Sequence, residues 1–416
     1  MVNTSNAYKE ALQGPRIFHH KVEITFGDGR TATAQDLMEL YSFQILDSTS
    51  NTNSFDLGSA IAGQLNIRLD NTDGRYDEYD FSEAEISAKV GLELADGTTE
   101  WIDKGTYISE PGEDTGASIT LKAYDNMIKF DRPYSLSKLA YPATLLQIVQ
   151  DACSCCGVLL APDSVVFDNS DFVVDKRPDD GAMTFRLVLQ YVCQIACRYA
   201  CITAEGKLSL RWYDTDLLEA TWQKDGETII SGNDNLIDVD TSGIVQVENL
   251  LNGSSITTDD VVITGIKVTE DGESGNDETS YLSGTEDYAL EITGNKLIQG
   301  TGEEIATFLG ERLNGLRFRP VSVSCQGNPA VEAGDIGLVK DAKGRYYKTI
   351  FTGATYNAYA AQSLVCGAEA PVRKSSQRYS EATKVYQKLR AQLAYQKSEV
   401  EKAFDDLGKQ MDSVQG

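Results

Sequence analysis

Short runs of alternating apolar and polar residues, separated by turns rich in Asp and Gly, fill the first third of this 416-residue chain. Successive side chains of a β-strand point to opposite faces of a sheet, so the alternation is typical of strands with one buried face. Asp-Gly pairs such as Asp73-Gly74 and Asp96-Gly97 supply the backbone conformation of tight turns. Many short strands with little helix between them predict an antiparallel barrel or sandwich. The expected strands are Val22–Phe26, Tyr41–Leu46, Gly63–Leu69, Glu85–Leu94, Trp101–Ile108 and Ser118–Tyr124.

The spacing of apolar residues becomes helical after Pro133. One helix is expected to begin after the cap residue Thr144 and to end at Gly157, and a second is expected to begin after Thr184. A hairpin is expected around Glu205-Gly206, because strand-like residues flank this pair on both sides. These elements predict a small α+β module between two β regions.

A second β region begins near Ile229. Thr301 and Glu304 match a capping box, so a helix is expected to begin there. The stretch Glu270–Glu286 is acidic, rich in Gly and Ser and nearly free of apolar residues, which predicts a mobile loop. The expected strands are Leu236–Val239, Ile244–Leu250, Asp260–Val268, Val321–Cys325, Asp335–Val339, Tyr346–Tyr356 and Ser363–Val365.

A seven-residue apolar repeat runs through Ser375–Gln415. Such a repeat keeps one narrow seam of a helix facing a partner, as a coiled coil requires. The alternative is a single amphipathic helix folded back on its own domain, since periodicity does not exclude intramolecular packing. The mixture of Tyr, Leu and Val does not fix an oligomer number. We predict that the seam residues make the oligomer contact: Tyr379, Tyr386, Leu393, Val400 and Leu407.

The formal net charge is −26, from 63 acidic and 37 basic residues. Such a charge repels phosphate backbones and anionic lipid, so specific nucleic-acid binding and membrane-surface binding are disfavoured, although DNA could pass without adhering. No apolar run is long enough to span a bilayer, and Met1–Gln13 lacks the pattern of a signal peptide. We therefore expect no membrane segment and assembly in the cytoplasm.

Six of the eight cysteines fall in two groups, which makes them the best candidates for a metal site: Cys153, Cys155 and Cys156, and Cys193, Cys197 and Cys201. Thiolates from two elements could hold zinc or an iron–sulfur cluster. However, the spacing matches no known metal motif, and buried cysteine often acts as a small hydrophobic residue. We therefore predict thiols without a metal or cofactor, and the second group is expected on one helix.

No catalytic motif stands out. His19 and His20 are the only histidines, and the most suitable role for them is a surface or subunit contact. The acidic turn Asp70–Asp80 does not follow the register of a calcium-binding loop. There is neither a Gly-x-Ser-x-Gly elbow nor a Walker-type phosphate loop, so the chain is predicted not to be an enzyme.

Three stretches together resemble a known family. The first comprises Leu69-Asp70-Asn71, Phe81–Ile86 and Ile102–Ile108; the second comprises Leu121–Asp131 with Pro133-Tyr134; the third comprises Thr184-Phe185-Arg186, Val192–Ala200 and Gly206-Lys207-Leu208. In this order they resemble the hub proteins at the tail tip or baseplate of tailed bacteriophages. The same region forms the N-terminal part of the prophage tail endopeptidase, or tail-associated lysin, family. The resemblance covers about residues 17–371.

The resemblance implies a homotrimer in the virion tail, assembled in the bacterial host cytoplasm. Each chain would carry two tail-tube-like β-barrel domains, so that three chains adapt a hexameric tail tube to a threefold tip around the DNA channel. The implied partners are the tail tube or a distal tail protein ring, and a tip spike or fibre protein. Many relatives continue into a lytic or fibre domain, whereas only a helical stalk is expected here, so lytic activity is not carried over.

These observations predict a mainly β protein with α+β parts. We expect an N-terminal arm at 1–16, a first barrel at 17–133 completed by strands after 199, an α+β module at 134–230, a second barrel at 231–371 and a coiled-coil stalk at 372–416. Two other functions remain open. One is a scaffold for a cell-wall-degrading endopeptidase that uses a histidine or a cysteine-bound metal, and the other is a carbohydrate-binding tail adhesin.

Overall fold

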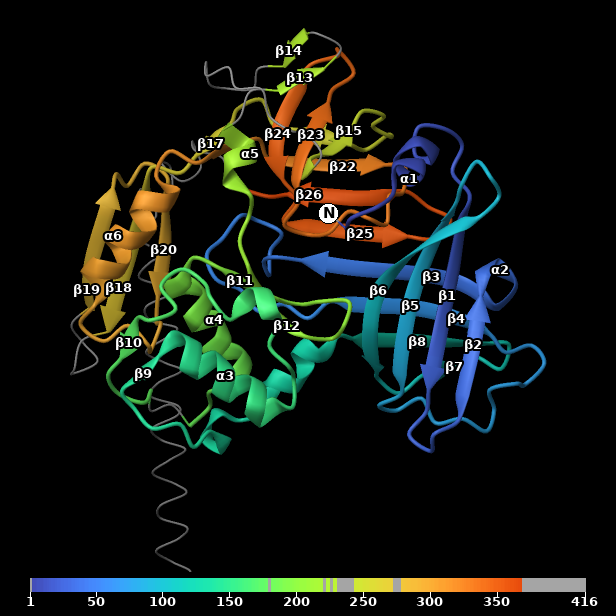
Figure 1. Cartoon of the computed structure of the whole chain (residues 1–416), viewed down its shortest axis with the longest axis horizontal. Helices are drawn as coiled ribbons and strands as arrows, with labels where there is room; N and C mark the ends of the chain where they lie inside the picture. The colour runs from blue at the N-terminus through green and yellow to red at the C-terminus, as the bar shows by residue number, and fades with distance from the viewer. Residues whose placement is uncertain are drawn as a thin grey trace, which may run out of the picture. The chain divides into compact units, whose positions relative to one another are not determined.

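Figure 1 presents a computed structural model that describes residues 2–178, 181–219, 222–224, 227–229, 243–271 and 278–368. Residues Met1–Ala368 form one compact unit. The predicted stalk, 372–416, lies outside the described residues, as do its seam residues Tyr379, Tyr386, Leu393, Val400 and Leu407. No helix in the described part of the chain is both long enough and apolar enough to cross a bilayer.

The dominant element is one twelve-stranded antiparallel sheet that contains strands from both ends of the unit (Figure 1). Its strands follow the order β16-β22-β26-β25-β3-β4-β8-β6-β5-β1-β2, with β7 beside β8. Their bounds are β1 Phe18–Thr25, β2 Thr31–Gln35, β3 Leu40–Ser48, β4 Gln64–Asp70, β5 Glu85–Glu93, β6 Thr99–Ser109, β7 Glu113–Asp114, β8 Ser118–Tyr124, β16 Ser255–Ile256, β22 Val321–Cys325, β25 Gly353–Asn357 and β26 Gln362–Cys366.

The N-terminal strands carry the predicted alternation. Val22 and Ile24 of β1 are completely buried, whereas the side chains between and after them are partly or fully exposed. The same face of β3, β4, β5 and β8 contributes Phe43, Ile67 and Ile86, among others, to one apolar cluster. Burial of this face is the main stabilising term for the sheet, because apolar surface removed from water contributes roughly 25 cal/mol per Å².

The prediction of two closed barrels is wrong for the described residues. The sheet is open, since its end strands β2 and β16 pair with one neighbour each and not with each other. The joint between the two β regions is the pairing of β25 with β3, in which Gly353 lies opposite Ser48 and Asn357 lies opposite Gln44. Four strands from after residue 199, β16, β22, β25 and β26, therefore extend the N-terminal sheet.

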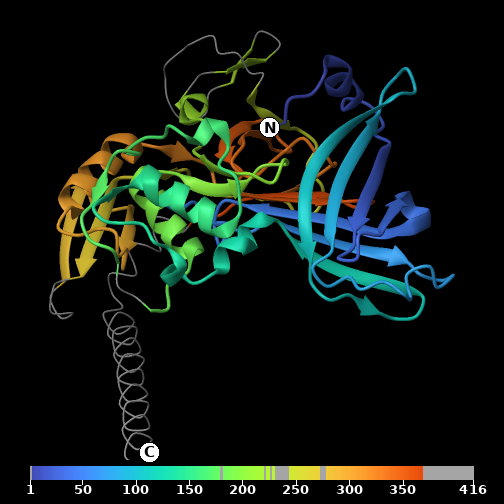
Figure 2. The same ribbon diagram turned by 60° about the horizontal axis from the view of Figure 1, so that its bottom comes forward.

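The α+β module contains the helices α3, Leu145–Cys156, and α4, Phe185–Ala196. Both predicted starts are confirmed, because the side-chain oxygens of Thr144 and Thr184 each accept a backbone N–H of the first helical turn. Gly157 ends α3 in the left-handed conformation that glycine favours. Figure 2 shows this module, coloured green, beside the N-terminal strands. Its other elements are β9 Ala143–Thr144, β10 Val173–Val174, β11 Tyr199–Ile202, β12 Leu208–Arg211, η1 Asn126–Asp131, η2 Tyr134–Leu136 and η3 Pro162–Ser164.

The rest of the second β region forms small open sheets. Helix α6, Gly302–Leu313, packs against β18 and β19. The sheets are β15-β23-β24 (Val245–Val247, Ile336–Lys340, Tyr346–Ile350), β19-β18-β20 (Glu278–Gly284, Gly265–Asp271, Ala289–Thr293), β17-β21 (Val261–Val262, Arg317–Phe318) and β13-β14 (Trp222–Lys224, Glu227–Ile229). The short helices are α1 Asn6–Ala11, α2 Asp36–Glu39 and α5 Thr215–Glu219.

In this region the predicted loop is wrong, and the helix predicted to begin after Thr301 is confirmed but has a different cap. The stretch Glu270–Glu286 was expected to be a loop, but most of its described residues belong to β18 and β19, which pair as antiparallel strands. The Thr301 side chain makes no capping bond at the start of α6. Instead, the Glu270 carboxylate accepts the Gly302 N–H over 2.5 Å. An acidic side chain from a distant strand therefore satisfies the helix N-terminus, where a negative charge is favourable.

Candidate functional site

The cysteines are dispersed through the core. Cys193 lies on α4, Cys197 is the left-handed residue that ends this helix, and Cys201 lies on β11, so the expectation of three cysteines on one helix is wrong. Burial raises the pKa of Cys156 to about 11 and that of Cys201 to about 12, which disfavours the thiolate that a metal needs. Across the described ranges, no three His, Cys, Asp or Glu side chains are placed to hold a metal ion.

The two histidines have different environments. His20 is buried, with its Nε2 2.9 Å from the hydroxyl of Tyr356, so the predicted surface role is wrong for this residue. Burial lowers the pKa of His20 to about 4, and the ring is therefore neutral at neutral pH. His19 Nδ1 lies 3.1 Å from Asp36 Oδ2, and its Nε2 lies 3.7 Å from Glu93 Oε2. These contacts connect β1 with α2 and β5, and they explain both histidines as structural residues.

The second and third stretches that carry the resemblance meet within the α+β module. The backbone N–H of Phe185, from the third stretch, donates to Arg132 O over 3.1 Å, and its ring packs edge-on against Tyr134 from the second stretch, with centroids 5.1 Å apart. The carboxylate of Asp131 pairs with the guanidinium of Arg186. Residues that are 50 or more positions apart in the sequence therefore form one contact.

A second set of polar contacts lies at the junction where the sheet joins the module. Asn126 Nδ2 donates to Gly206 O over 2.8 Å, which joins the second stretch to the β11–β12 turn of the third. Asp125 accepts the N–H groups of Gly63 over 2.8 Å and of Met127 over 2.9 Å. Buried backbone N–H groups need such acceptors, because an unsatisfied one costs about 1–3 kcal/mol. The polar residues of the motifs therefore hold loops together at the junction.

A small cavity of about 60 Å³ lies at this junction, with Asp47 and Asp125 among its lining residues. Burial raises the pKa of Asp47 to about 6 and that of Asp125 to about 7. Arg211 also lines the cavity, and its guanidinium lies 3.6 Å from the carboxylate of Glu332. Perturbed carboxylates can mark a catalytic site. Here both aspartates accept backbone N–H groups, including that of Ala333 for Asp47, which explains them as loop anchors.

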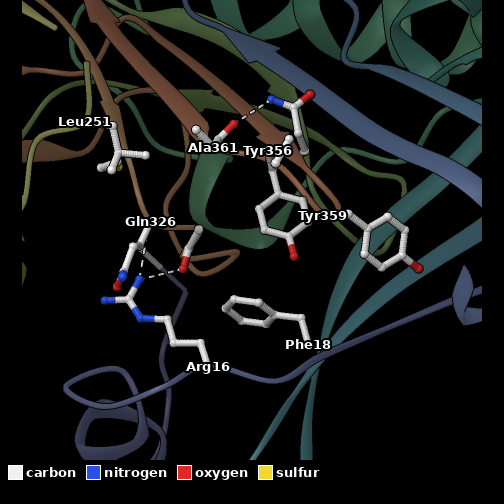
Figure 3. Close-up of a pocket in the computed structure, with 11 residues that line it drawn as sticks. Arg16, Phe18, Leu251, Gln326, Tyr356, Tyr359 and Ala361 are labelled. Atoms are coloured by element: carbon white, nitrogen blue, oxygen red, sulfur yellow. Dashed lines mark hydrogen bonds between the residues drawn. The ribbon is translucent and has the colours of Figure 1, made fainter. Parts of the chain in front are cut away.

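A larger pocket of about 320 Å³ lies between the N-terminal arm and the sheet (Figure 3). Neither its position nor its residues could be predicted from a local motif, because it combines four distant segments of the chain. Its volume lies in the range of small-ligand sites. Its lining residues are Arg16, Phe18, Leu251, Cys325, Gln326, Gly327, Tyr356, Asn357, Tyr359, Ala360 and Ala361.

The chain is similar to solved structures of tail proteins. For a tail protein from Neisseria meningitidis, the identity is 12% and the TM-score 0.47, with 83% of this chain and 95% of that chain covered. For the 43 kDa tail protein of prophage MuSo2 from Shewanella oneidensis, the identity is 10% and the TM-score 0.46, with 83% of this chain and 96% of that chain covered. For prophage tail protein gp18 from Listeria monocytogenes, the identity is 11% and the TM-score 0.47, with 86% of this chain and 98% of that chain covered.

These TM-scores are too low to establish a common fold, so the likeness alone carries no conclusion about the function of this chain. No protein-family model and no curated protein matches the sequence.

Proposed function

We propose that the chain is a structural component of a phage or phage-like tail tip or baseplate. In this role it is a homotrimeric hub that joins a hexameric tail tube, or a distal tail protein ring, to a threefold tip with a spike or fibre. The hub surrounds the channel through which DNA passes. It is a part of the virion tail and catalyses no reaction.

The observation that carries the proposal is the contact between two of the resembling stretches within the α+β module. The second and third stretches resemble the hub family in sequence, and Tyr134 and Asn126 of the second contact Phe185 and Gly206 of the third. Residues that pack on one another depend on each other's size and polarity. Their joint presence therefore supports the architecture of the hub family more strongly than separate surface motifs would.

The charge of the chain supports the same role. A formal net charge of −26 gives a surface that repels DNA phosphates. A channel wall with this sign lets DNA move past without adhering. The sheet-rich unit and the predicted stalk give such a subunit a body and an axial oligomer contact.

The mass in solution tests the oligomer. We expect the full chain to scatter light as a trimer, at three times its mass of 45.5 kDa, whereas a chain that ends at residue 371 is expected to be mainly monomeric. The double variant Leu393→Glu, Leu407→Glu places charges in the predicted seam and is expected to dissociate the trimer, because a seam requires apolar residues.

Ser398→Glu is the matched control, since Ser398 lies in the same segment but off the seam positions of the repeat. This variant is expected to stay trimeric. A full chain that is monomeric at every concentration measured, or a double variant with the same mass as the unchanged chain, would contradict the proposed seam.

A further inference from the structure

Arg16 is a partly buried cation that is held rigidly. Its Nε and Nη2 donate to Leu12 O over 3.0 and 2.7 Å. Its Nη1 donates to Gln326 O over 3.2 Å and to Gly327 O over 2.6 Å (Figure 3). Within the described part of the chain these partners are all backbone carbonyls, and no carboxylate pairs with the guanidinium. In a chain with 63 acidic residues, this cation is therefore fixed in position but not neutralised.

Arg16 lines the pocket of about 320 Å³ described above. The rings of Phe18 and Tyr356 form one wall of this pocket, in an edge-on arrangement with centroids 6.1 Å apart. Two large apolar side chains at this pocket remain strongly exposed, Leu251 at 43% and Tyr359 at 47%. In Figure 3 they lie on opposite sides of the pocket. Exposed apolar side chains around a pocket are typical of a surface that is covered by a partner.

Tyr359 is held in an unfavourable backbone conformation. Its φ is +62°, in the left-handed region that a bulky residue rarely adopts. Such strain is concentrated at sites where it positions a side chain for function. Here it places the ring at the pocket, 5.1 Å from the ring of the buried His20.

A second pocket, of about 180 Å³, shares Arg16, Cys325 and Gln326 with the first. Gln362 lines it and is 1% exposed. The Oε1 of Gln362 accepts the Asn328 N–H over 2.6 Å, which fixes the orientation of the amide. Its Nε2 has no hydrogen-bond partner among the described residues, and a buried unpaired donor is costly. An acceptor from a bound molecule would satisfy it.

We propose that the two pockets together bind an extended peptide segment of a partner protein. A carboxylate of this segment pairs with Arg16, an adjacent apolar or aromatic side chain enters the pocket beside Tyr359, and a backbone carbonyl accepts from Gln362. A peptide is favoured because one extended chain offers a charge, an apolar group and a carbonyl in succession. The proposed tail role does not involve these pockets, so the peptide site is tested independently of that role.

The test is a selection with the full chain as bait and a display library of random short peptides as probe. We expect enrichment of peptides with Asp or Glu next to Phe, Tyr, Trp or Leu. A selected peptide, labelled with fluorescein, is then titrated by fluorescence polarisation. Arg16→Gln is expected to weaken binding by about tenfold or more, as for the loss of a hydrogen bond to a charged group.

Two further variants separate binding from folding. Tyr359→Gly removes the ring and relieves the left-handed strain, so it is expected to weaken binding while the melting temperature stays unchanged or rises. Arg30→Gln is the control, because Arg30 pairs with Asp28 on the exposed β1–β2 turn, and it is expected to leave binding unchanged. The proposal is overturned if no peptide is enriched, if the enriched peptides lack an acidic residue, or if Tyr359→Gly binds as tightly as the unchanged chain. Glycan binding in place of peptide binding would overturn it equally.

Discussion

Phe185→Ala is expected to lower the free energy of unfolding by about 4 kcal/mol, which is the middle of the range for truncating a fully buried phenylalanine. The Phe185 side chain is 0% exposed. It packs on Tyr134 within the α+β module, so its removal leaves a cavity in the core of the module that the neighbouring backbone cannot easily fill. Urea denaturation followed by tryptophan fluorescence measures the loss.

Phe308→Ala is the matched control for this prediction. Phe308 is also a helical phenylalanine, but it lies partly exposed on α6 with the guanidinium of Arg312 over its ring at 3.8 Å. Phe308→Ala is expected to lower the free energy of unfolding by only about 1 kcal/mol, because the ring of Phe308 buries less apolar surface on folding than the ring of Phe185 does. Equal losses for Phe185→Ala and Phe308→Ala would contradict the importance that we assign to the contact between Phe185 and Tyr134.

Gly58→Ala is expected to destabilise the chain by about 3 kcal/mol, from backbone strain together with overpacking. Gly58 lies in the loop between β3 and β4, with φ at +67°. A Cβ added there would lie 2.5 Å from the backbone N of Gln194 on α4, a contact that requires the helix or the loop to move. Thermal and urea unfolding measure the effect.

Gly97→Ala separates the two contributions. Gly97 has a similar φ, +79°, but an added Cβ would meet nothing within 4 Å. This change is expected to cost only about 1 kcal/mol, since it introduces backbone strain without a collision. If both variants lost the same stability, the close approach of the β3–β4 loop to α4 would not be a determinant of the fold.

Local signals in the sequence predicted the local structure well. The helices α3 and α4 begin after Thr144 and Thr184 because a threonine oxygen can satisfy an N–H only a few residues ahead. The strand alternation around Val22 and Ile24 likewise reports which face is buried. In each case the determining interaction lies within a few residues of the chain, so the sequence contains the information directly.

Features that depend on distant pairing could not be predicted in this way. Whether the sheet closes on itself or continues into β25 depends on residues about 300 positions apart, such as Ser48 and Gly353. Strand β19 resembled a loop because none of its side chains is buried, and backbone pairing with β18 instead defines it. His20 was assigned to the surface because its partner Tyr356 lies 336 positions away.

The candidate sites show the same difference between features set by nearby residues and features set by residues distant in the sequence. Phe185 and Asn126 could be selected from the resemblance, although their contacts with Tyr134 and Gly206 required the fold. The Arg16 pocket gave no signal in the sequence, since Arg16, Gln326 and Tyr359 belong to separate segments. The predicted seam, Tyr379 to Leu407, lies outside the described residues and remains a prediction.

Electron cryomicroscopy of the purified full-length chain tests the tail-hub assignment most directly. We predict particles in which three copies surround an open central channel, with the sheet-rich bodies arranged about the threefold axis. Particles that contain a single copy, or an assembly of copies with no hole along its axis, would contradict the assignment.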